Sequence, residues 1–257
     1  MTGAVAVVCG LVGLAVGSFT NVVIHRVPRR ESVVRPGSHG PACGSSIRPA
    51  DNVPVVSWLV LRARCRACGA RIPARYPLVE AGTGALFAVM ALRFGAGAEL
   101  PAYLVLVAAL VALSVIDLDT YLLPNVITYP LAGALVALLG LAAAVRADPG
   151  PWLRALGGGG AAFGFFLVVH LISPRGMGFG DVKLSFSLGV ALGWLSWGHV
   201  FIGLFLGFLL GALVGGALIV LGRRSRRQHL PFGPFLAAGT ILGVLAGEPL
   251  LDLWLGR

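Results

Sequence analysis

Residues 101–119 read PAYLVLVAALVALSVIDLD, and this stretch decides the class of fold. Its first sixteen residues carry no charge. They nearly suffice for a helix across the ~30 Å hydrocarbon layer of a bilayer, which takes about 20 residues. Two carboxylates, Asp117 and Asp119, follow at the end of the stretch. A carboxylate at membrane depth is costly and is usually retained because chemistry or ion movement requires it. The stretch therefore predicts a membrane helix with a functional acid at one end.

The composition of the whole chain also indicates a membrane protein. Hydrophobic residues make up 57% of the 257 residues, charged residues make up 12%, and the mean hydropathy is +0.90. These values exclude a water-soluble domain with a polar surface. We expect an all-α, polytopic helical integral membrane protein with about eight transmembrane helices. The expected spans lie near 4–24, 78–94, 101–116, 126–145, 153–173, 182–197, 200–221 and 233–254.

The net charge of +10 is concentrated in two arginine clusters. The first lies between the first two spans and contains Arg26, Arg29, Arg30, Arg35, Arg48, Arg62, Arg64, Arg66, Arg71 and Arg75 against the acids Glu31 and Asp51. The second follows the seventh span and contains Arg223, Arg224, Arg226 and Arg227. An even number of spans separates the clusters, so both face one side, which the positive-inside rule makes the cytoplasm. The charge is therefore a topology signal, and we expect the lipid bilayer, rather than nucleic acid, as a partner.

The same topology brings two acidic segments to one membrane face. From a cytoplasmic loop at 25–77, the third span returns to the cytoplasm and ends at Asp117. The fifth span also returns, and Gly176-Met177-Gly178-Phe179-Gly180-Asp181 follows it. Two carboxylates about 3 Å apart cannot both ionise, so one keeps a proton. The charged member can take a proton from water while the protonated member polarises a scissile carbonyl. We expect Asp117 and Asp181 to form this catalytic pair.

Residues beside the two aspartates have supporting roles. Asp119 lies two residues after Asp117 on a helix, so the two side chains point to different sides and Asp119 is expected to face water. Gly178 and Gly180 leave room for an extended substrate beside Asp181 and are the expected substrate-binding positions. The alternative for Asp181 is that it only stabilises the start of the next helix.

The segment 176–184, GMGFGDVKL, resembles the GxGD aspartyl-protease signature of the type IV prepilin peptidase family. Four other segments agree with that family in order and spacing, namely GSFTNVVIHR at 17–26, RYPLVE at 75–80, DLDTYLLPN at 117–125 and PFGPF at 231–235. The resemblance covers essentially the whole chain.

The resemblance implies an aspartic endopeptidase that removes the short basic leader of type IV prepilins and pseudopilins on the cytoplasmic side, with the cut after a glycine. Bacterial members of this length often also methylate the new N-terminal amine with S-adenosylmethionine. By position, the family's catalytic residues are again Asp117 and Asp181. The family motif more often ends in Asp where this chain has Asn125, and we expect activity to survive that replacement. The implied location is the bacterial cytoplasmic (inner) membrane. The implied substrates belong to type IV pili, type II secretion or DNA uptake.

The cysteines of the 25–77 loop indicate a metal site. In a reducing compartment, Cys65-Arg66-Ala67-Cys68 is more typical of metal binding than of a disulfide, and Cys43 adds a third thiolate. Structural zinc normally has four ligands, but Gly40 stands where the family has a fourth cysteine. His39 or water would then complete the site, and a metal-free loop is the alternative. The departure affects the expected methyl transfer more than the proteolysis.

Three other features receive simpler interpretations. The glycines at 157–160 are expected to let helices pack closely. Glu80 is expected either to stabilise the first turn of the second span or to hold the substrate's new amine. His170, inside the fifth span, is expected to form a hydrogen bond between helices.

These features predict three parts of the chain: a first transmembrane helix at 1–24, a cytoplasmic cysteine-containing, arginine-rich loop domain at 25–77 and a membrane-embedded peptidase core at 78–257. An ion- or proton-coupled transporter that uses the same aspartates is the main alternative. No internal repeat supports it, and both acids are expected near one face rather than at the midplane. A catalytically inactive assembly factor would have lost one aspartate, and both are present.

Overall fold

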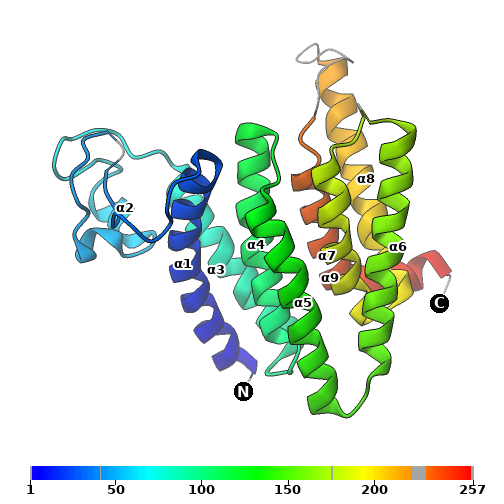
Figure 1. The fold of residues 1–257 in the computed structure, drawn as a ribbon. Coiled ribbons are helices and arrows are strands. Elements are labelled where there is room, and N and C mark those ends of the chain that lie inside the picture. Colours follow the sequence, from blue (N-terminus) through cyan, green and yellow to red (C-terminus); the bar gives the residue numbers. More distant parts are fainter. Residues whose placement is uncertain (1, 41, 175, 222–229, 256–257) are drawn as a thin grey trace. The chain divides into compact units, whose positions relative to one another are not determined.

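The structure is a computed structural model that describes residues 2–40, 42–174, 176–221 and 230–255 (Figure 1). Helices dominate these residues, whose only β pairing is two isolated bridges. This confirms the prediction of an all-α fold. In chain order the elements are α1 (Thr2–Arg26), η1 (Val27–Arg29), η2 (Pro49–Asn52), α2 (Val56–Val60), α3 (Arg75–Phe94), α4 (Leu100–Thr120), α5 (Asn125–Arg146), α6 (Gly150–Ile172), α7 (Phe179–Leu195), α8 (Trp197–Val220) and α9 (Gly233–Leu255).

Each of the eight predicted spans coincides with one long helix. Within the described residues, seven helices are long and apolar enough to cross a membrane: α1, α3, α4, α5, α6, α8 and α9. The eighth, α7, has 17 residues and most of them are buried in the protein. The chain is therefore a multi-pass membrane protein. The second arginine cluster, at 223–227, lies outside the described residues, so its predicted position stays a prediction.

The helices form two compact units, Met1–Leu100 (unit 1) and Pro101–Arg257 (unit 2). In unit 1, α1 packs along α3 through glycines. A Cβ atom on Gly17 would lie 2.7 Å from the Cα of Glu80, and one on Gly13 would lie 2.8 Å from the side chain of Phe87. Such close approach is a common use of small residues between membrane helices. The loop between α1 and α3 carries η1, η2 and α2.

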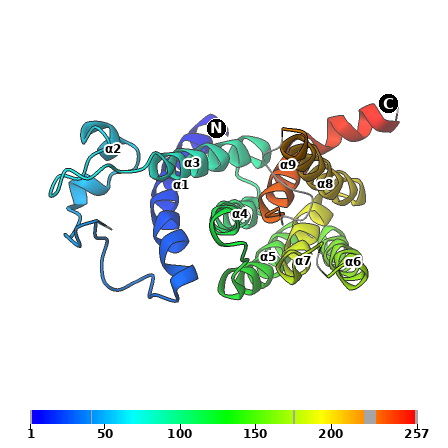
Figure 2. The same cartoon turned by 90° about the horizontal axis from the view of Figure 1, so that it is seen from above.

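In unit 2, α7 lies among other helices and contacts α5, α6, α8 and α9 (Figure 2). Its packing against α6 depends on glycines: a Cβ atom on Gly189 would lie 2.3 Å from the carbonyl oxygen of Gly158. A Cβ atom on Gly159 would lie 2.6 Å from the side chain of Val190. These contacts confirm the predicted packing role of Gly158 and Gly159. The prediction is wrong for Gly160, where an added Cβ would meet no atom within 4 Å.

Helices α4 and α7 run in opposite directions. The hydroxyl of Tyr103, near the start of α4, donates a hydrogen bond of 2.8 Å to the carbonyl oxygen of Ala191, near the end of α7. A helix rises 1.5 Å per residue, so Asp117 lies about 21 Å from this bond towards the end of α4. Asp181 lies about 15 Å from the same bond towards the start of α7. The end of α4 and the start of α7 therefore lie at the same end of unit 2.

Candidate functional site

Asp117 lies in the last turn of α4 and is held by a backbone amide of α9. The residue is 5% exposed. The N–H of Gly233 donates a hydrogen bond of 2.9 Å to its Oδ2 atom. A Cβ atom on Gly233 would lie 2.9 Å from the same oxygen, so this approach depends on glycine. Asp119 is exposed, which confirms the predicted directions of these two aspartates.

Asp181 lies in the first turn of α7, three residues after the N-cap Gly178. The residue is 7% exposed, and its Oδ1 atom makes no hydrogen bond within the described residues. Its backbone N–H donates to the carbonyl of Gly178 at 3.1 Å. Buried polar atoms nearly always have a hydrogen-bond partner, and within the described residues this oxygen is an exception.

The Gly233 partner of Asp117 and the Gly180 neighbour of Asp181 lie against the same side chain. Leu123, from the turn after α4, connects their surroundings. A Cβ atom on Gly180 would lie 3.0 Å from the Cβ of Leu123, and one on Gly233 would lie 3.2 Å from its Cδ2. The structure thus brings together the segments of Asp117 and Asp181, as the count of spans predicted.

The two predicted substrate-binding glycines have different surroundings. Gly180 is half-buried and packs against Leu123, so its lack of a side chain serves the packing of the protein itself. Gly178 is exposed, and a Cβ atom there would approach only the Asp181 carboxylate, at 3.4 Å, and the Gly180 amide, at 3.9 Å. Free space beside Asp181 is therefore found at Gly178.

Other residues near the pair carry contacts that the sequence did not predict. The Lys183 ammonium donates a hydrogen bond to Asn125 Oδ1 and lies 5.6 Å from the centre of the Phe179 ring. The Nδ1 atom of His170 lies 2.8 Å from the carbonyl oxygen of Met177, which belongs to the loop between α6 and α7, so the predicted bond between helices is instead a bond from α6 to the loop that follows it. Gly233 was missed as a partner of Asp117 because any residue supplies a backbone N–H. The only signal was its place in the PFGPF motif.

Unit 1 gathers the three predicted cysteines. The Sγ atoms of Cys43, Cys65 and Cys68 all lie within 4.8 Å of one another. Hydrogen bonds from the side chain and backbone of Ser45 lower the pKa of Cys43 to about 7, which favours the thiolate that binds metal. The chemistry and spacing of this donor set fit zinc.

Two neighbouring positions bear on a fourth ligand. A Cβ atom on Gly40 would lie 3.2 Å from Cys43 Sγ and 3.9 Å from Cys65 Sγ, so the position of the missing family cysteine faces the thiols. The His39 ring does not join the cluster. Its Nδ1 atom lies 3.1 Å from the carbonyl oxygen of Gly37 and 3.5 Å from the Arg26 guanidinium.

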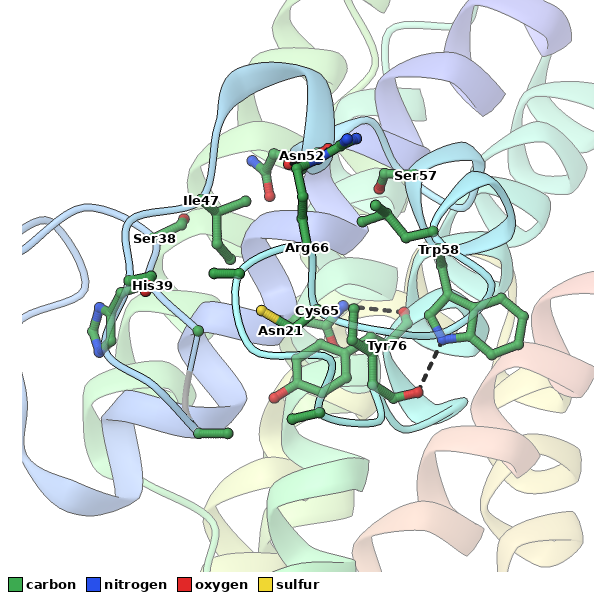
Figure 3. A pocket seen from close by; sticks show the side chains of 18 of the residues that line it. Asn21, Ser38, His39, Ile47, Asn52, Ser57, Trp58, Cys65, Arg66 and Tyr76 are labelled. Carbon is green, nitrogen blue, oxygen red and sulfur yellow. Dashed lines mark hydrogen bonds and ion pairs between the residues drawn. The ribbon is translucent and has the colours of Figure 1, made fainter.

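A cavity of about 540 Å³ lies beside the cysteines, and all of its lining residues belong to unit 1 (Figure 3). Trp58 and Tyr76 supply aromatic surface, and Glu80 supplies a carboxylate. The Oε2 atom of Glu80 accepts a 2.7 Å hydrogen bond from the N–H of Val55. Because α3 begins at Arg75, Glu80 lies in its second turn, so the predicted first-turn role is wrong.

Comparisons with known proteins match nearly the whole chain. The model of the bacterial peptidase A24 N-terminal domain matches residues 11–94, and that of the type IV leader peptidase family matches residues 104–219. A prepilin leader peptidase/N-methyltransferase of Bacillus subtilis is 36% identical over 95% of both chains. A protein of the same name from Burkholderia pseudomallei is 39% identical over 93% of this chain and 84% of its own length. Another from Pseudomonas aeruginosa is 35% identical over 95% of this chain and 91% of its own length. No solved structure matches. The chain belongs to the type IV leader peptidase family.

Proposed function

We propose that this protein is a prepilin leader peptidase, an aspartic endopeptidase whose catalytic pair is Asp117 and Asp181. The observation that carries the proposal is that two buried carboxylates from different helices lie in segments that meet at Leu123, and that one of them has an oxygen without a partner in the described part of the chain. The motifs of both aspartates lie in a chain of the type IV leader peptidase family. The substrates are type IV prepilins and pseudopilins.

In the proposed mechanism, one carboxylate takes a proton from a water molecule and the other, protonated, polarises the scissile carbonyl. The Gly233 amide fixes the orientation of Asp117 in this step. The Oδ1 atom of Asp181, which has no partner among the residues that the structure describes, can bond to the water or to the substrate. The extended substrate segment lies along Gly178 towards Gly180, with Gly178 providing the open space. Burial of both carboxylates strengthens their interactions with the reacting groups.

We place the reaction at the cytoplasmic face of the bacterial inner membrane. The arginines of the 25–77 loop support this topology. We assign 1–24 to a first transmembrane helix, 25–77 to a cytoplasmic domain and 78–257 to the membrane-embedded peptidase core.

The second proposed activity is methylation of the new N-terminal amine with S-adenosylmethionine, as the names of the relatives indicate. The cavity in unit 1 supports this assignment, because its volume falls within the ~300–1,000 Å³ range of ligand pockets. Zinc held by Cys43, Cys65 and Cys68 would stabilise the loop that forms one wall of the cavity.

A transporter is less well supported. Transporters bind ions near the membrane midplane, whereas Asp117 and Asp181 lie at helix ends.

The proposal is tested by incubating the purified protein in lipid with a prepilin and S-adenosylmethionine. Mass spectrometry should detect loss of the leader, with the cut after a glycine, and a methyl group on the new amine. The controls show that the protease is folded and that the substrate is inserted in the same vesicles. If the prepilin then stays uncleaved, the peptidase assignment is refuted. Cleavage without methylation would refute only the second activity.

A further inference from the structure

The cysteine loop contains two turns of the same design. The first knuckle is formed by residues 40 and 42–44, with residue 41 outside the described part of the chain, and the second knuckle is formed by residues 65–69. Each is closed by a hydrogen bond from the N–H of its first residue to the carbonyl of the residue after its last, Gly40 to Ser45 at 2.8 Å and Cys65 to Ala70 at 2.8 Å. Each ends in a glycine with positive φ, 68° at Gly44 and 72° at Gly69. By position, Gly40 corresponds to Cys65, and Cys43 corresponds to Cys68.

The first knuckle therefore lacks one thiolate at a place that faces the thiols of Cys43 and Cys65. The missing Cβ of Gly40 points to within 3.2 Å of Cys43 Sγ. The backbone does not demand glycine there, because Gly40 is not among the residues with positive φ. Within the described residues, the cluster offers the three cysteines alone, and His39 is bonded elsewhere.

The opening left by Gly40 leads into the cavity of unit 1. Gly40, Cys43 and Cys65 all line this cavity, so a small molecule in it can reach the cluster. Zinc sites with three protein ligands keep a fourth position for an exchangeable group, whereas closed structural sites have four.

We infer that Cys43, Cys65 and Cys68 hold a metal ion with an exchangeable fourth coordination position that opens into the cavity and takes a neutral nitrogen or oxygen donor. This inference rests on the metal site proposed above. Three thiolates around a divalent ion leave one net negative charge, so a neutral donor adds no further repulsion, and imidazole nitrogen suits zinc and its analogues. The metal site thus differs in kind from a closed four-cysteine site.

Cobalt(II) in place of zinc tests the inference, because its visible spectrum reports on its ligands. The full-length protein in detergent is loaded with cobalt(II) and titrated with imidazole. The wild-type ligand-field bands should shift saturably. Gly40→Cys should give about one third more thiolate-to-cobalt intensity, from four thiolates instead of three, and no response to imidazole.

Gly37→Cys is the matched control, since it adds a thiol to the same loop where a Cβ meets no atom within 4 Å. It should keep the wild-type response to imidazole. If the wild-type protein binds cobalt(II) but imidazole does not change its spectrum, the inference is overturned while the metal site stands. Failure to bind cobalt or zinc would overturn the metal site and the inference together. The wild-type titration decides even if Gly40→Cys does not fold.

Discussion

At the scale of single residues, the site depends on a backbone amide as well as on side chains. Asp117 Oδ2 accepts its hydrogen bond from Gly233, which is 116 positions away in the chain. A side chain at position 233 would compete with the carboxylate for the same space.

Gly233→Ala should therefore lower leader cleavage by about 100-fold, the scale of loss expected when a catalytic group is displaced by about 1 Å. The added Cβ would lie 2.9 Å from Asp117 Oδ2. Gly133→Ala, where a Cβ meets no atom within 4 Å, is the control and should cleave as the wild type does. Equal rates for both variants would show that the Gly233 contact does not orient Asp117.

Some of these residue-scale features could be predicted and others could not. The directions of Asp117 and Asp119 follow from helix geometry and were predicted correctly. The bond from Gly233 could not be predicted, because it depends on how α9 packs in the folded protein. The same holds for Glu80, whose contact with Val55 comes from the fold of the loop and not from its place on α3.

At the scale of helices, the packing of α6 on α7 positions the helix that carries Asp181. Gly189→Ala should lower the free energy of unfolding by about 1–3 kcal/mol, because its Cβ would overlap with Gly158 and a tight core tolerates extra volume poorly. Gly160→Ala provides the comparison, since its Cβ meets open space. Thermal unfolding in the same detergent measures both, and a melting temperature unchanged by Gly189→Ala would contradict the tight packing seen at this contact.

The knuckles give a second prediction at this scale. The purified protein should carry about one zinc ion, and Cys65→Ser should lose most of it, because tetrahedral zinc sites depend on each thiolate. Leader cleavage should change little, since Asp117, Asp181 and the contacts described for them all belong to unit 2. Elemental analysis measures the zinc. A content near zero that Cys65→Ser does not alter would show that the loop folds without metal.

The helices themselves were predictable, because a long apolar segment in a bilayer must satisfy its own backbone hydrogen bonds and a helix does so. For the glycines, the sequence predicted that the run at 157–160 packs against another helix, but not which of its members makes the contact. Gly158 and Gly160 lie in one run, and only the rotation of α6 against α7 decides which of them meets a neighbour.

At the scale of the whole molecule, the distribution of arginines predicts the topology. Proteins with a single cysteine should be labelled in spheroplasts by a membrane-impermeant maleimide. Cys65 should be protected, because the 25–77 loop faces the cytoplasm, and Ala96→Cys, an exposed position between α3 and α4, should react. Labelling of Cys65 from outside, in spheroplasts shown to be sealed, would reverse the topology.

The central claim is that Asp117 and Asp181 form the proteolytic pair. Leader cleavage by Asp117→Asn, Asp181→Asn and Asp119→Asn tests it most directly, in proteins shown to be folded and inserted. Asp117→Asn and Asp181→Asn should each lose at least about 100-fold in rate, because an amide cannot take or share the required proton. Asp119→Asn, at an exposed position on the same helix, should stay near the wild-type rate. Near-normal cleavage by Asp117→Asn or Asp181→Asn would contradict the two-aspartate mechanism, and loss in Asp119→Asn and Asp181→Asn alone would make Asp119 the partner.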